Sequence, residues 1–93
     1  MEERELVPGT VYPINEINFR EENLRGLYLG IDLSKINPHV ILFKRDEAVR
    51  RCRFSAYVFK NSGNAISIVN AVEHPPKENE KEDLESRLKM AGL

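Results

Sequence analysis

In the segment 51–59, two arginines and two aromatic residues occupy odd-numbered positions, a pattern that a binding surface could use. In a β-strand, alternate residues share one face, so the odd-numbered arginines and aromatic residues of this segment would lie together. Arginine binds carboxylates and phosphates, and exposed aromatic rings stack on bases. The sequence therefore predicts a basic-aromatic face, whose candidate binding residues are Lys44, Arg45, Arg51, Arg53, Tyr57 and Phe59.

Two kinds of ligand fit this predicted face. We expect a protein partner first, because the net charge of the chain is −1 and nucleic-acid-binding domains usually carry a markedly basic balance. The alternative is RNA or single-stranded DNA bound by the same residues. A third interpretation is a face without a ligand, in which a C-terminal helix covers Tyr57 and Phe59.

Charge is unevenly distributed along the 93 residues. Residues 26–72 carry seven bases and three acids, whereas residues 73–93 carry six acids and four bases. The opposite signs lead to the hypothesis that the acidic tail folds over the basic hairpin and competes with its ligand.

The sequence contains no recognisable catalytic or metal-binding motif. His39 and His74 are far apart, and neither belongs to a local pair of ligands with zinc-site spacing. Cys52 alternates with apolar residues, which predicts a buried thiol and not a reactive one. The five glycines are scattered and form no phosphate-binding loop. We expect a non-enzymatic binding or regulatory module without metal or cofactor.

The number of cysteines and the length of the apolar runs indicate the cellular compartment in which we expect the protein. A single cysteine cannot form an internal disulfide, which favours a reducing compartment, and we expect the cytoplasm. The acidic N-terminus lacks the apolar run of a secretory signal. No segment approaches the roughly 20 apolar residues that a membrane span needs, so we expect no membrane partner.

The hydrophobic pattern predicts about five strands within a β domain of residues 1–76. Segments 51–59 and 65–72 alternate on either side of the turn residues 61–64 and predict an antiparallel hairpin. Its inward residues are expected to be Cys52, Phe54, Ala56, Val58, Ile66, Ile68 and Val72. The other predicted strands are 10–14, 27–33 and 39–43, the last with both faces partly covered.

Three residues mark special backbone positions. Pro13 has no N–H, so we expect its strand at a sheet edge, where the region near Tyr12 could add to a partner's sheet. Gly30 predicts a bulge or bend within its strand. Segment 18–26 is predicted to be a loop with a turn of helix, ending in Gly26 as a left-handed cap.

Residues 77–93 are predicted to form a charged C-terminal helix or tail. His74, Pro75 and Pro76 end the strands, and Leu84, Leu88 and Ala91 then form a narrow apolar stripe. The sequence leaves open whether this stripe docks on its own sheet or on another chain. A homodimer through the stripe or the edge strand is one such arrangement.

Together these patterns predict a mainly β fold: a small antiparallel barrel or a strongly curved sheet of about five strands, followed by an α-helix. The alternative is an open α+β sheet with the helix packed across one face. In strand number and length the chain resembles SH3-type barrels. No sequence motif accompanies that resemblance, so it implies no function.

Overall fold

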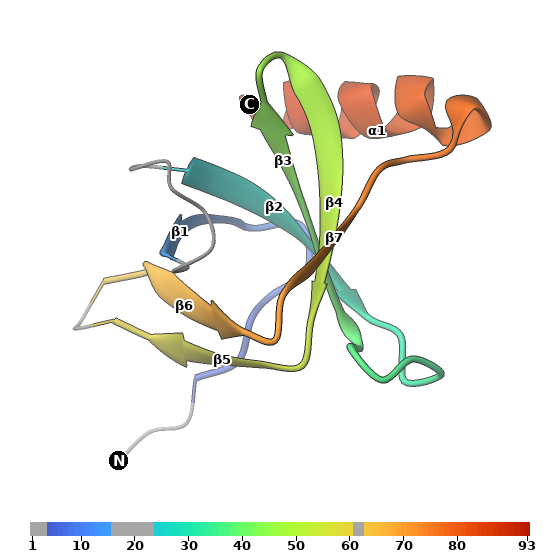
Figure 1. Cartoon of the computed structure of the whole chain (residues 1–93). Helices are drawn as coiled ribbons and strands as arrows, with labels where there is room; N and C mark the ends of the chain where they lie inside the picture. Colours follow the sequence, from blue (N-terminus) through green and yellow to red (C-terminus); the bar gives the residue numbers. More distant parts are fainter. Residues whose placement is uncertain (1–3, 16–23, 61–62) are drawn as a thin grey trace.

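The computed structural model describes residues 4–15, 24–60 and 63–93 of the chain. Within these residues, seven strands form one curved sheet and one helix follows it (Figure 1). The strands are β1 (Val11–Asn15), β2 (Leu24–Ile31), β3 (His39–Arg45), β4 (Ala48–Phe54), β5 (Ala56–Phe59), β6 (Ile66–Val69) and β7 (Val72–His74), and the helix is α1 (Glu78–Met90). The predicted mainly β fold with a C-terminal helix is confirmed.

The strand order in the described part of the chain is β5-β6-β1-β2-β3-β4-β7. Neighbouring strands are antiparallel except β1 and β6, which pair in parallel through Ile14 and Asn15. Among the residues that the structure describes, hydrogen bonds do not close the sheet into a barrel. Only Ser55 separates β4 from β5, so one continuous stretch of backbone reaches from near one end of the sheet to the other.

The predicted hairpin is present, and it bends in the middle. Arg51 lies opposite His74 in the β4–β7 half, and Ala56 lies opposite Val69 in the β5–β6 half. When the sequence numbers of two paired residues are added, the total is the same in both halves. No residue is therefore inserted at the bend, and the halves share one register. At the bend, the Ser55 N–H donates to the Val69 carbonyl over 3.1 Å. Each of the two predicted strands of the hairpin breaks at this bend. The five predicted strands are therefore seven in the described part of the structure.

The bend also changes which residues face the core. Before it, the even-numbered residue Phe54 is fully buried. After it, Val58 is 62% exposed, whereas Tyr57 and Phe59 pack against the core. Between Phe54 and Tyr57 the alternation of inward and outward residues shifts by one residue with no change in pairing register, so the faces are reversed. The predicted inward residues that lie instead at the surface are Ala56, Val58 and Val72.

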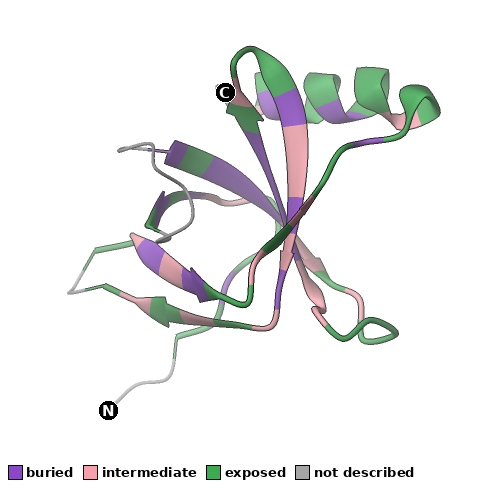
Figure 2. Ribbon diagram, in the orientation of Figure 1, coloured by how far each residue is buried: buried purple, intermediate pink, exposed green. Residues whose placement is uncertain are grey.

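Two apolar clusters cover the two faces of the sheet (Figure 2). The larger cluster is enclosed by the curved sheet and includes Ile41 and Phe43 of β3. The smaller cluster joins the opposite face to the helix, and β3 contributes Leu42 to it. Strand β3 is therefore apolar on both faces, as its continuous apolar run predicts.

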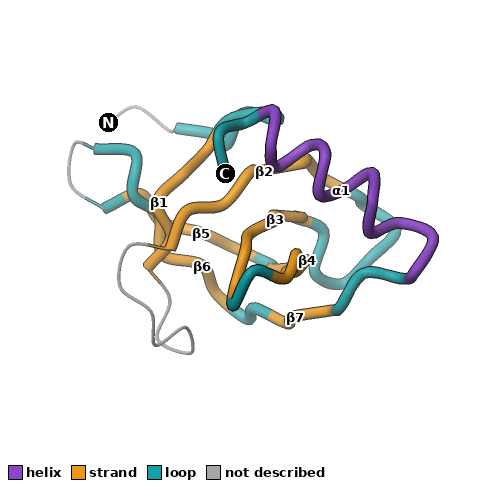
Figure 3. The backbone as a smooth tube through the Cα atoms, turned by 90° about the horizontal axis from the view of Figure 1, so that it is seen from above, coloured by secondary structure: helices purple, strands orange, loops and turns teal. Residues whose placement is uncertain are grey.

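The C-terminal helix docks on its own sheet. Leu84 and Leu88 are buried against Leu27, Leu42 and Val49, and the helix lies outside the curve of the sheet (Figure 3). This position answers the question of where the apolar stripe packs. It also shows that the helix does not cover the predicted aromatic pair, which packs in the other cluster.

Strand β1 lies inside the sheet, so the prediction that it forms an edge is wrong. Its residue Pro13 pairs with Arg25 of β2, while β6 begins its pairing one residue later, at Ile14. The missing N–H of proline therefore interrupts no ladder bond that the structure would otherwise form. Both surfaces proposed for a homodimer, this strand and the helix stripe, are occupied within the chain, and a homodimer itself stays a prediction.

Two glycines of β2 have different roles. Gly30 has φ of +122° at a register shift between β2 and β3, so the predicted bulge is confirmed. Gly26 is not a helix cap; it lies within β2, where an added Cβ would come within 2.6 Å of the Ile14 side chain and 2.8 Å of Ile41. Close packing of the core requires a glycine here. The rest of the predicted loop, residues 18–23, lies outside the described residues.

Helix docking gives a first testable prediction. Replacing the fully buried Leu88 with alanine leaves a cavity between helix and sheet, and should lower the free energy of unfolding by about 2–5 kcal/mol. Met90, on the same helix, is 86% exposed, and its replacement by alanine should change stability by less than about 0.5 kcal/mol. Urea denaturation measures both. Equal effects of the two substitutions would contradict the docked position.

Candidate functional site

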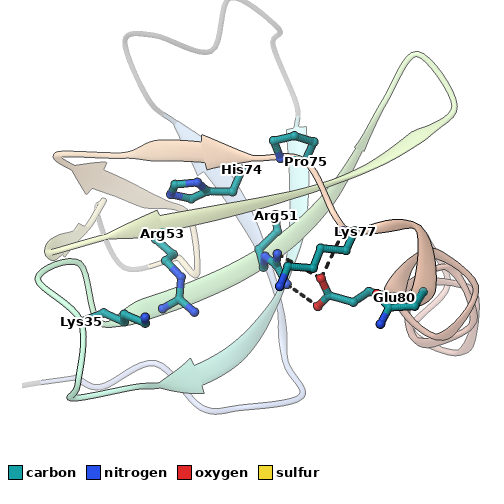
Figure 4. Close-up of a pocket in the computed structure, with 8 residues that line it drawn as sticks. Lys35, Arg51, Arg53, His74, Pro75, Lys77 and Glu80 are labelled. Atoms are coloured by element: carbon teal, nitrogen blue, oxygen red, sulfur yellow. Dashed lines mark hydrogen bonds and ion pairs between the residues drawn. The ribbon is translucent and has the colours of Figure 1, made fainter.

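A pocket of about 650 Å³ lies between β4, β7, the loop after β2 and the start of α1 (Figure 4). Most of its lining side chains are basic. The lining residues are Lys35, Arg51, Arg53, His74, Pro75, Lys77, Asn79 and Glu80. Four of these side chains are lysine or arginine and one is acidic, so the pocket can attract an anion.

The bent hairpin places the two arginines in the pocket. Arg51 and Arg53 alternate along β4 on the face that carries the helix, and His74 of β7 lies directly opposite Arg51. Pro75 and Pro76 then end β7 and lead to Lys77, the N-cap residue of α1. Strand pairing and the short connection together gather cationic residues from distant parts of the sequence.

Arg51 is held by the helix. Its guanidinium donates to the two carboxylate oxygens of Glu80, over 2.7 Å to Oε2 and 3.4 Å to Oε1. Glu80 also accepts a hydrogen bond of 3.1 Å from the Lys77 backbone N–H, and so caps the first turn of α1 with its side chain. The hydrogen bond from Arg51, followed by the one from Lys77, lowers the pKa of the Glu80 carboxyl. This carboxylate therefore joins the helix terminus to the hairpin.

Arg53 has a donor that is not used. Its Nη1 atom is buried and has no hydrogen-bond partner among the described residues, and its Nη2 atom is 3.9 Å from Asp32. Asp32 instead accepts hydrogen bonds from the hydroxyl and the backbone N–H of Ser34, which together lower its pKa. Because Nη1 itself is buried, a ligand in the pocket would accept from the rest of the Arg53 guanidinium.

The loop after β2 brings Lys35 to the pocket. The Asp32 side chain organises this loop through Ser34, and the Asp32 backbone N–H donates to the Pro38 carbonyl over 2.7 Å. On either side of Lys35, two apolar side chains are almost fully exposed: Leu33 is 86% exposed and Ile36 is 94% exposed. The cationic pocket therefore lies beside an exposed apolar surface.

Only two of the six predicted binding residues line this pocket. Lys44 is exposed near the end of β3, and Arg45 pairs with Glu73 over 2.8 Å and lies 5.3 Å from the centre of the Phe43 ring. Neither belongs to the residues around Arg51 and Arg53.

The two predicted aromatic residues face away from the arginines. The Tyr57 hydroxyl accepts from the Leu6 backbone N–H over 3.2 Å and donates to the Arg4 carbonyl over 3.4 Å. The Arg4 guanidinium in turn lies 3.9 Å from the centre of the Phe59 ring. These rings hold the N-terminal segment against the sheet, so the predicted basic-aromatic face is divided between the two faces of the hairpin.

The pattern of the sequence did not identify Lys35, His74 and Lys77 as site residues. A signal for His74 existed, because extending the hairpin pairing outward from the turn at residues 61–64 places it opposite Arg51. No comparable signal existed for the two lysines. They reach the pocket through a loop and a helix terminus, whose positions depend on tertiary packing.

Comparison with protein-family models, with curated proteins and with solved structures gave no match. Among the described residues, no group of three or more histidine, cysteine or acidic side chains could hold a metal ion. In the same part of the chain, no helix has both the length and the apolar character needed to cross a membrane. The functional argument therefore rests on the geometry of the pocket.

His39 lies in the aromatic part of the core. Its ring stacks on Phe54 at 5.0 Å between centres, and its Nδ1 is 2.9 Å from the Tyr28 hydroxyl. Burial lowers the pKa of His39, and burial is also the main cause that raises the pKa of Tyr28 to about 12. Folding thus favours the neutral imidazole.

This environment predicts a pH dependence of stability. Because the folded state lowers the pKa of His39, its neutral form contributes stability above the unfolded value of about 6.5, and that contribution is lost as pH falls further. The unfolding free energy of the wild type should fall between about pH 7 and pH 5. A His39→Gln variant should show a flatter profile by chemical denaturation. Parallel profiles would exclude His39 as the responsible group.

Proposed function

We propose that the protein is a non-enzymatic binding module that recognises an acidic segment of a protein partner through the cationic pocket. The observation that carries this proposal is the convergence of Lys35, Arg51, Arg53 and Lys77 on one pocket that contains a single acid, Glu80. Arg53 lines this pocket, and its Nη2 atom lies 3.9 Å from Asp32, beyond hydrogen-bond distance. Charge-assisted hydrogen bonds from arginine to carboxylates are among the stronger polar contacts in proteins.

The surroundings of the pocket favour a protein over a nucleic acid. Leu33 and Ile36 expose apolar side chains on either side of Lys35, and exposed apolar residues beside arginines are typical of protein interfaces. Single-stranded nucleic acid needs aromatic platforms beside a basic track, but Tyr57 and Phe59 pack against the core on the other face.

The proposed compartment is the cytoplasm. The single cysteine, Cys52, is fully buried and cannot form an internal disulfide, so this fold needs no oxidising environment to assemble.

A peptide library displayed on phage tests the proposal, with the intact protein as bait. We expect selected peptides to carry acidic residues next to apolar ones. Their affinity should fall at least about tenfold for Arg53→Gln, since a desolvated charged hydrogen bond is lost. The matched control is Lys60→Ser, which removes one positive charge at the far end of the hairpin and should leave the affinity unchanged.

Two results would contradict the proposal. One is the absence of any enriched peptide, or peptides that bind Arg53→Gln as well as they bind the wild type. The other is tighter binding of single-stranded RNA or DNA at low salt that depends on Arg53, with an affinity that falls linearly in log salt. That second result would assign the pocket to nucleic acid.

A further inference from the structure

The charge of the pocket exceeds what one carboxylate ligand would neutralise. Four basic side chains line it; Glu80 balances Arg51, Asp32 lies 3.9 Å from Arg53, and the two lysines remain. A phosphorylated serine or threonine carries a charge of about −1.5 to −2 at neutral pH and three acceptor oxygens. We infer that the pocket binds the phosphoryl group of a phosphorylated side chain on the partner; this inference rests on the proposed function.

Donors for the phosphoryl oxygens come from three directions. Arg51 and Arg53 reach the pocket from β4, Lys35 from the loop after β2, and Lys77 from the start of α1 (Figure 4). The Nη2 atom of Arg53 lies 3.9 Å from Asp32, too far for a hydrogen bond, so it can donate to a phosphoryl oxygen. Guanidinium groups match the geometry of phosphate, and lysines add charge at its edge.

The helix terminus adds to this field. Lys77, Asn79 and Glu80, at the N-cap and in the first turn of α1, all line the pocket. The N-terminus of a helix carries partial positive charge and favours anions placed near it. This contribution supplements the four basic side chains, which carry the inference.

A second pocket adjoins the first and shows where the peptide would continue. It measures about 390 Å³ and shares Arg51, Arg53 and Glu80 with the cationic pocket. Its apolar lining includes Leu29, Val40 and Leu84, and its acidic lining includes Asp32 and Asp83. An apolar side chain next to the phosphorylated residue would fit this second pocket. Its three arginines, which include Arg87, are matched by three acids, so it offers no excess positive charge to a second phosphate.

The acids of the helix argue against a long polyanion. Glu78, Glu82, Asp83 and Glu85 are exposed along α1, whose first turn contributes to the cationic pocket. A single compact dianion would stay within the pocket, whereas a chain of phosphates that continued along the helix would pass these like charges. The geometry therefore favours a phosphorylated protein segment.

Glu80 acts as an internal competitor of this ligand. Its carboxylate already binds Arg51 over 2.7 Å, so the phosphoryl group must share Arg51 or displace Glu80. Glutamine at this position can keep the hydrogen bond from the Lys77 backbone N–H while removing the negative charge. A Glu80→Gln variant should therefore bind the phosphorylated ligand roughly five- to tenfold more tightly, because one like charge is removed from the pocket.

Titration of the ¹⁵N-labelled intact protein tests the inference by NMR. The probes are N-acetyl-phosphoserine amide, N-acetyl-aspartate amide and inorganic phosphate, at pH 7.5 and constant ionic strength. Phosphoserine amide should shift the amide signals of residues 35, 51–53 and 77–80 with saturation. Its affinity should exceed that of the aspartate amide at least about tenfold, because its charge is larger. Arg53→Gln should abolish saturation, and Lys60→Ser should match the wild type.

Four other results of these titrations would contradict the inference, and each would have a different meaning. Equal affinities for the phosphoserine and aspartate amides would overturn it, while Arg53-dependent binding of library peptides would leave the proposed function standing. Tighter binding of inorganic phosphate than of phosphoserine amide would identify a free anion as the ligand. If a single-stranded oligonucleotide bound more tightly than phosphoserine amide through the same residues, a phosphorylated protein would not be the ligand. No binding at this pocket by any probe or library peptide would overturn both proposals.

Discussion

The arrangement of the site depends on how one antiparallel hairpin bends while it keeps its register. The β4–β7 and β5–β6 halves pair with the same register on either side of Ser55. The residue alternation shifts at that point, so Arg51 and Arg53 face the helix, whereas Tyr57 and Phe59 face the core. A straight hairpin would place all four side chains on one face. The bend converts that face into a cationic pocket on one side and an aromatic core on the other.

The helix completes the pocket through two contacts of different kinds. Leu84 and Leu88 are buried on the sheet, and burying a leucine side chain stabilises a protein by about 1.5–3 kcal/mol. The ion pair between Arg51 and Glu80 lies near the surface, where such pairs contribute little to stability. Apolar packing therefore holds the helix in place. The ion pair instead orients Arg51 and sets the start of the helix beside it.

The sequence predicted the features that depend on local pattern. The hairpin, the bulge at Gly30, the end of the strands before Pro75 and the helix with its leucine stripe all follow from alternation, glycine, proline and helical periodicity. The faces of Tyr57 and Val58 could not be predicted in this way. A shift of one residue at Ser55 leaves the apolar pattern of the segment nearly unchanged, because both of its faces carry apolar or aromatic residues.

The same limit applies to the site. Arg51 and Arg53 were predicted, since their spacing on a strand is local. Lys35 and Lys77 join them only after the loop and the helix pack on the sheet, and Lys44 and Arg45 are separated from them by the same packing. The internal position of β1 could not be predicted from the sequence either. Pro13 lacks only one hydrogen-bond donor, and the pairing of β1 with β6 begins at the next residue, Ile14.

Cross-strand NOEs in the labelled protein test the bent hairpin most directly. The account predicts contacts between Arg51 and His74 and between Ala56 and Val69, together with contacts of the Tyr57 ring to His39 in the core. It predicts that the Val58 methyl groups show no contacts to core residues. Contacts from Val58 to the core, with the Tyr57 ring beside Arg53, would show an unbent hairpin and contradict the account.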